Sequence, residues 1–139
     1  MARISEDYVS FETAKLLKEK GFDEDCLKYY IEGGKYIRDL SDEDWPHRLK
    51  NSKANENIVT VPTLQMAMKW LREVHHISID VCIVQGREVS YMFNIWNFSN
   101  IQDNKFIGGT FDLREQLYDF KTYEEAVEAA LKYCLENLI

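Results

Sequence analysis

Two neighbouring segments decide the fold of this chain, because apolar and polar residues alternate along both of them. They read Ile77-Ser78-Ile79-Asp80-Val81-Cys82-Ile83 and Val89-Ser90-Tyr91-Met92-Phe93-Asn94-Ile95. A period of two is typical of strands that bury one face of a sheet. The segment 85–88 between them contains a glycine and predicts a turn. We therefore expect a β-hairpin whose apolar face packs in the core.

Helical patterns lie on either side of this hairpin in the sequence. Before it, apolar residues at helical spacing predict a helix from Leu64 to His75 with a buried stripe. The stripe consists of Leu64, Ala67, Met68, Leu71 and Val74. After it, Thr122-Tyr123-Glu124-Glu125 forms a capping box that predicts the start of a last helix, and its apolar stripe continues to Leu138.

A third strand is expected over residues 106–111, where Gly108-Gly109 indicates a bulge or a close backbone approach. The C-terminal part of the chain therefore follows the order α-β-β-(β)-α. A long turn is expected at 99–105, between the second and third of these strands.

The N-terminal part shows a helix and a small hairpin. Ser10 is a good N-cap for a helix over about 11–20, and Gly21 supplies the left-handed residue that ends it, with Phe22 folding back on Leu17. Residues 27–31 and 36–37 predict two short strands joined at Gly33-Gly34. Residues 41–46 and 51–57 are polar and predict loops.

These patterns predict an α+β protein with an antiparallel β-sheet of about three to five strands and helices packed mainly on one face. The length of 139 residues fits a single domain over 1–139. The first sixty residues carry few regular apolar stripes, and we expect that they would not fold alone.

Charge and composition narrow the range of partners. The formal net charge is −7, distributed over both halves of the chain, and such a surface repels phosphate backbones and anionic lipid. No apolar run approaches the roughly 18 residues that span a bilayer, and the N-terminus has no signal-peptide core. Three cysteines far apart in sequence predict free thiols rather than a disulfide framework. We expect a cytoplasmic protein that binds neither membrane nor nucleic acid.

Motifs for catalysis, cofactors and metals are weak throughout. The adjacent pair His75-His76 points in two directions on a helix and cannot readily hold one ion. The acidic clusters 23–25 and 42–44 lack the glycine and glutamate of a calcium loop. No phosphate-binding loop and no nucleophile motif is present. We therefore assign no catalytic, cofactor-binding or metal-binding residue and expect a protein that is not an enzyme.

Aromatic residues on the second strand are the candidate interaction surface. Met92, Trp96 and Phe98 fall on the strand face opposite Phe93 and Ile95. Left exposed, they would form an apolar patch of the kind that binds another protein. The alternative is that the N-terminal hairpin, with its tyrosines at 29, 30 and 36, folds over them, and we expect this cover because monomers seldom leave such patches open.

Two resemblances bear on function. The order of the C-terminal elements is similar to that of double-stranded-RNA-binding domains, which place lysines at the start of the last helix. The matching positions here are Tyr123, Glu124, Glu125 and Glu128, and their carboxylates would repel RNA.

Longer stretches of sequence resemble a second group of proteins. These stretches are 10–17 with Gly21-Phe22, Pro62-Thr63 followed by 69–75, and 122–126. Together they are similar to short proteins of gut Bacteroidetes genomes and their prophages, to which no activity is assigned. The resemblance implies a cytoplasmic protein of mobile-element origin.

We therefore expect a non-enzymatic binding or accessory protein that engages another protein, or a second copy of itself, through the sheet or its aromatic face. The alternative is a nucleic-acid-binding regulator. It would require a basic stripe assembled from Lys15, Lys18, Lys20, Arg48, Lys50, Lys69 and Arg72.

Overall fold

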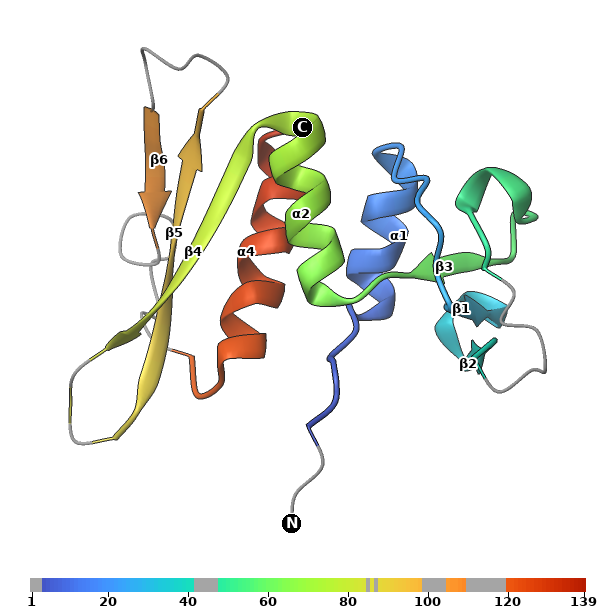
Figure 1. Ribbon diagram of the computed structural model, residues 1–139, viewed down its shortest axis with the longest axis horizontal. Helices are drawn as coiled ribbons and strands as arrows, with labels where there is room; N and C mark the ends of the chain where they lie inside the picture. The colour runs from blue at the N-terminus through green and yellow to red at the C-terminus, as the bar shows by residue number, and fades with distance from the viewer. Residues whose placement is uncertain (1–3, 42–47, 85, 87, 99–104, 110–119) are drawn as a thin grey trace. The chain divides into compact units, whose positions relative to one another are not determined.

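The structure is a computed structural model that describes residues 4–41, 48–84, 86, 88–98, 105–109 and 120–139. Within these residues the chain forms two three-stranded antiparallel sheets and three α-helices, which confirms the α+β class (Figure 1). The contacts divide the chain into an N-terminal unit, Met1–Gln65, and a C-terminal unit, Met66–Ile139. The expectation of a single domain stays a prediction.

Helix α1 (Phe11–Glu19) begins and ends as the sequence predicts. The Ser10 hydroxyl accepts a hydrogen bond from the backbone N–H of Thr13 at 3.3 Å. At the other end Gly21 has a φ of 92°, and the N–H of Phe22 donates to the carbonyl of Leu17 at 2.9 Å. The Phe22 side chain is buried, as expected for the hydrophobic contact that closes such a helix end.

The sheet of the N-terminal unit has the order β2-β1-β3. Strands β1 (Lys28–Ile31) and β2 (Tyr36–Asp39) form the predicted hairpin, joined by a 3₁₀ turn at Glu32–Gly34. Strand β3 (Val59–Val61) was not predicted. It is three residues long and fully buried, so it is too short to show the alternation by which strands are recognised in a sequence.

Asn51 joins distant parts of the N-terminal unit. It begins the 3₁₀ turn Asn51–Lys53 and is 8% exposed. Its side-chain N–H donates to the Phe22 carbonyl at 2.9 Å, and its side-chain oxygen accepts from the Thr60 N–H at 3.0 Å. The side chain therefore satisfies a backbone carbonyl after α1 and a backbone N–H in β3, two groups that would be costly to bury unpaired.

In the C-terminal unit, helix α2 (Leu64–His75), which begins just before the unit boundary, leads into a sheet of order β4-β5-β6. The strands are β4 (Ile77–Val84), β5 (Ser90–Asn97) and β6 (Lys105–Gly109). Val81 pairs with Phe93 and Ile79 with Ile95, which confirms the predicted hairpin. The β5–β6 pairing shifts register between Ile95 and Trp96, so the expected irregularity near Gly108-Gly109 is also confirmed.

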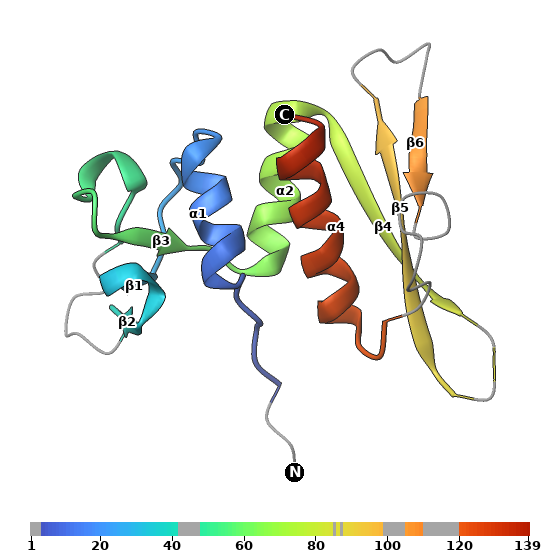
Figure 2. The same ribbon diagram turned by 180° about the vertical axis from the view of Figure 1, so that it is seen from behind.

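Helix α4 (Tyr123–Asn137) packs against β4 and β5. The Thr122 hydroxyl accepts from the N–H of Glu125 at 3.1 Å, as the capping box predicts. Six residues of the predicted apolar stripe are buried: Ala126, Val127, Ala130, Leu131, Cys134 and Leu135. Leu138, its predicted last member, is the C-cap after the helix and is half-buried. Figure 2 shows α4 along one face of the sheet, and α2 on the same side of it.

The predicted core positions at three apolar residues were wrong. Val74 on α2 is 51% exposed, whereas Trp70, which was not assigned to the stripe, is 6% exposed. Ile83 on β4 and Val89 before β5 are each 66% exposed. In both views the turn end of the β4–β5 hairpin extends beyond the first turn of α4, so no described helix covers it (Figures 1 and 2).

Some predicted turns fall outside the part of the chain that the structure describes. The loop expected at 41–46, the hairpin turn at 85–88 and the long turn at 99–105 lie there wholly or in part. The expected third strand over 106–111 is described only as far as Gly109.

Candidate interaction surface

The side chains of β4–β6 that point away from α4 form one surface, which we call the outer face. Because Ile77, Ile79, Phe93 and Ile95 are buried on the α4 side, the alternate residues of the same strands point the other way. Pairing then places Ser78 opposite Trp96, Asp80 opposite Asn94, and Cys82 opposite Met92. On the other side of β5, Trp96 pairs with Phe106.

Trp96 and Phe106 form the apolar centre of the outer face. Their ring centroids are 4.9 Å apart at an interplanar angle of 53°, and the side chains are 38% and 44% exposed. Aromatic pairs at this separation attract one another, and their exposed area is costly to keep in water. A tryptophan held in place by a second ring is a typical anchor residue of a protein interface.

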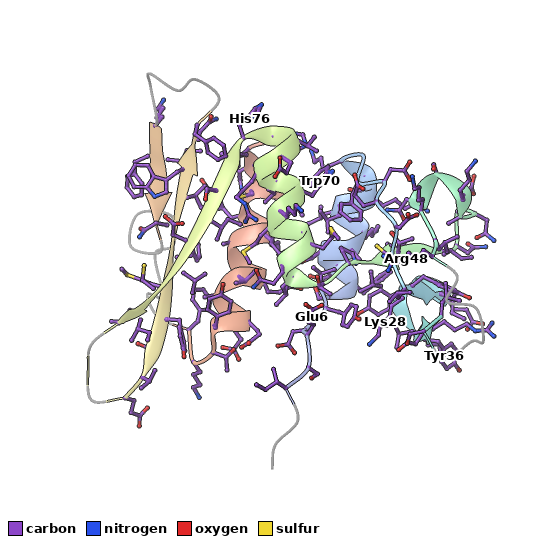
Figure 3. The ribbon with its side chains drawn as sticks, in the orientation of Figure 1. Glu6, Lys28, Tyr36, Arg48, Trp70 and His76 are labelled. Atoms are coloured by element: carbon purple, nitrogen blue, oxygen red, sulfur yellow. The ribbon has the colours of Figure 1, made fainter. Side chains whose placement is uncertain are left out.

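A depression of about 340 Å³ lies beside this pair. It is lined by Arg72, Ser78, Asp80, Trp96 and Phe98. Phe98 is held at the end of β5, because its N–H donates to the His76 carbonyl at 2.9 Å and its ring meets the His76 ring at 5.9 Å. His76 has a φ of 57° and lies where α2 turns into β4 (Figure 3). This turn brings the end of α2, with Arg72, to the depression.

The depression combines a cation, an anion and two aromatic rings. Arg72 and Asp80 are exposed side chains, and no ion pair between them occurs within the described residues. The guanidinium and the carboxylate are therefore available to groups of opposite charge, while the rings offer apolar contact. Such a mixture suits a peptide or protein surface better than a small apolar ligand, because it is open and only partly apolar.

The predicted site residues are only partly brought together. Trp96 and Phe98 both line the depression, whereas Met92, half-buried on the same strand face, does not. Phe106, Arg72 and Asp80 were missed as site residues. Their positions depend on the pairing of β6 with β5 and on the placement of α2 beside the depression. The alternation of residues along a single strand predicts neither of these. The expected cover by the N-terminal hairpin stays a prediction, because that hairpin belongs to the other unit.

The histidines at the end of α2 and the acidic residues are the remaining candidates for metal binding. Burial, together with the charge of His76, lowers the pKa of His75, and the ring of His75 packs edge-on against Trp70 at 4.7 Å. Over the described residues, no three His, Cys, Asp or Glu side chains come together as a metal site would require. None of the described helices is long and apolar enough to cross a membrane.

The three cysteines differ in environment. Burial raises the pKa of the Cys26 thiol to about 11 and that of Cys134 to about 12. Cys82 is exposed on the outer face. We expect a thiol reagent at pH 7.5 to label one cysteine in the folded protein and all three in denaturant. Absorbance of the released reagent measures this, and Cys82→Ser should remove the fast phase. Rapid labelling that persists in Cys82→Ser would contradict the assignment.

No family model, no curated protein and no solved structure matches the chain.

Proposed function

We propose that the protein is a non-enzymatic binding module that engages another protein through the outer face of the C-terminal unit. The observation that carries the proposal is the exposed Trp96–Phe106 pair beside the depression that contains Arg72 and Asp80. Aromatic residues and arginine are enriched at the centres of protein interfaces, and a polar rim surrounds them.

The charge of the chain restricts the kind of partner. With a net charge of −7, the protein attracts basic surfaces and repels acidic ones. We therefore propose a partner that inserts an apolar or aromatic side chain against Trp96 and presents a basic group to Asp80. The cytoplasmic location and the mobile-element origin stay predictions.

Nucleic acid is a less suitable partner on the described residues. The first turn of α4 carries the exposed acids Glu124 and Glu125, where RNA-binding domains of the same element order carry lysines. Lys18, one of the cations that the alternative requires, donates instead to the carbonyls of Ile58 at 2.7 Å and Asn55 at 3.2 Å. Its ammonium group therefore already has two backbone partners in the N-terminal unit.

An affinity pull-down from the lysate of the source organism, with and without nuclease, tests the proposal. We expect a stoichiometric protein that is retained after nuclease treatment and lost when Trp96 and Phe106 are both replaced by alanine. The matched control is Tyr36→Ala, because Tyr36 is an exposed aromatic residue on β2 (Figure 3) and lies outside the outer face. Capture that disappears with nuclease would replace the proposal by the nucleic-acid alternative.

A further inference from the structure

The edge of β4 is a second surface with unpartnered groups, and it is distinct from the outer face. Among the strands that the structure describes, in the order β4-β5-β6, β4 pairs with β5 alone and is a margin of the sheet. The opposite margin is extended, because Tyr91 exchanges two backbone hydrogen bonds of 2.8 Å with Phe120 on the β6 side of β5. No described residue makes the equivalent bonds to β4.

The direction of each backbone group of β4 follows from these bonds. In antiparallel pairs, hydrogen-bonded and non-hydrogen-bonded positions alternate. Because Tyr91 points its backbone groups to Phe120, its pairing with Ile83 is of the non-bonded kind. The N–H and C=O groups of Ile83 therefore point outward, as do those of Val81, Ile79 and Ile77 by the same alternation. Four residues thus present a continuous ladder of donors and acceptors that no described residue uses.

The composition of β4 makes this edge prone to pairing. Five of the residues Ile77–Val84 are isoleucine or valine, and Asp80 is the one charged residue among them. Soluble proteins usually blunt a free edge with charges, proline, a bulge or a covering element. Of these protecting features, the eight residues of β4 have only one charged side chain, Asp80, which points to the outer face. The composition of β4 is therefore typical of a strand whose edge is paired in the functional state.

The occupant that best fits this edge is a second copy of the same strand. Ile77 and Ile79 are 3% and 8% exposed beneath α4, whereas Ile83 at the other end of β4 is 66% exposed. A two-fold axis perpendicular to the sheet reverses the second strand. It therefore places the uncovered end of each β4 beside the covered end of the other, where the partner's α4 can shield it.

Geometry and charge select the register of this pairing. Outward-pointing residues must face outward-pointing residues, so the axis passes through a residue and not between two. The axis through Asp80 would set two carboxylates directly opposite one another, which is unfavourable. With the axis through Val81, the two β4 strands overlap over almost the same length, and Asp80 lies opposite Cys82 of the partner subunit instead.

We propose that the protein forms a homodimer in which two β4 strands pair antiparallel about a two-fold axis at Val81, giving a continuous six-stranded sheet. The proposal does not depend on the outer face, because a monomer could still bind a partner there. Conversely, the dimer could form without one.

Sedimentation of the full chain gives the first test. We expect twice the chain mass of 16.4 kDa for the wild type. We expect the single-chain mass for Val81→Pro, because proline removes one outward N–H and leaves the bonds to β5 intact. Val81→Thr retains the N–H and is expected to remain dimeric. A monomeric wild type, or a folded Val81→Pro variant that still dimerises, would overturn the proposal.

Disulfide trapping tests the register and remains informative if Val81→Pro does not fold. With Asp80→Cys, a second thiol lies opposite Cys82 of the partner subunit in a non-hydrogen-bonded pair, where Cα atoms are about 4.5 Å apart and a disulfide can form. We expect a covalent dimer under mild oxidation with Asp80→Cys, and none with Asp80→Cys/Cys82→Ser.

Two further chains report the competing registers. Ser78→Cys would cross-link to Cys82 only if the axis lay at Asp80, and the unmodified chain would cross-link only if the axis lay at Cys82. Efficient trapping of Ser78→Cys or of the unmodified chain, or trapping of Asp80→Cys that persists in Asp80→Cys/Cys82→Ser, would overturn the proposed register.

Discussion

Replacing Phe93 with alanine is expected to lower the free energy of unfolding of the C-terminal unit by about 3–5 kcal/mol. Phe93 is 1% exposed on the α4 side of β5, and its ring centroid lies 6.0 Å from that of Phe120. Truncation removes both the buried ring and its contacts, and the close-packed surroundings can fill the cavity only in part.

Urea denaturation followed by far-ultraviolet circular dichroism measures this loss. The matched control is Phe106→Ala, which truncates the same side chain in the same sheet but on the outer face, at 44% exposure. Its loss is expected to stay below that of Phe93→Ala by at least about 2 kcal/mol, because less area leaves a buried environment. Equal losses for the two variants would contradict the assignment of the two faces.

Replacing Asn51 with leucine is expected to cost the N-terminal unit about 2–6 kcal/mol, because two buried backbone groups lose their partners at about 1–3 kcal/mol each. These groups are the Phe22 carbonyl and the Thr60 N–H. Leucine has the branching and heavy-atom count of asparagine with no polar atom, but its two methyl groups are bulkier, so overpacking adds to the loss of hydrogen bonds.

The same denaturation measurement applies to Asn51→Leu, with Asn57→Leu as the control at an exposed position. Asn51→Asp is a further comparison, because it keeps an acceptor for the Thr60 N–H and loses the donor to the Phe22 carbonyl. We expect it to fall between the wild type and Asn51→Leu. An Asn51→Leu variant as stable as Asn57→Leu would contradict the bridging role.

The two core variants together test whether the chain is one folding domain. Hydrogen exchange resolves each unit separately in Phe93→Ala and in Asn51→Leu. If the sequence-based expectation of a single domain holds, each substitution accelerates exchange in both units. Acceleration confined to the substituted unit would show that Met1–Gln65 and Met66–Ile139 unfold independently.

Local chemistry made parts of the fold predictable. The ends of α1 and the start of α4 depend on Ser10, Gly21 and Thr122. Each of these residues acts on backbone groups only a few positions away, so the helix ends could be predicted from the sequence. The hairpin β4–β5 could be predicted for a similar reason, because one buried face requires apolar and polar residues to alternate along each strand.

Features that depend on distant parts of the chain were not predictable. β3 is a strand because it pairs with β1 and receives the Asn51 side chain, and three residues carry no periodic signal of this. Ile83 has the same pattern as Ile79, yet it is exposed because α4 does not reach it. The periodicity of a strand tells which side a residue faces and not how far the covering helix extends.

Two residues of the candidate site, Trp96 and Phe98, were predictable from the sequence. Trp96 could be placed on the outer face from the alternation of β5. Its neighbour Phe106 depends on the register shift between β5 and β6, and Arg72 on the turn at His76. A single sequence does not show which residues far apart in the chain lie side by side. The depression could therefore be identified only from the structure.

The most direct test of the account is a calorimetric titration of the captured partner against purified wild type, Trp96→Ala and Tyr36→Ala. If the outer face carries binding, Trp96→Ala weakens the affinity about 30-fold or more, the effect of an interface anchor worth about 2 kcal/mol, while Tyr36→Ala leaves it unchanged. Equal affinities for the wild type and Trp96→Ala, with the fold of the variant intact, would contradict the assignment of the outer face as the binding surface.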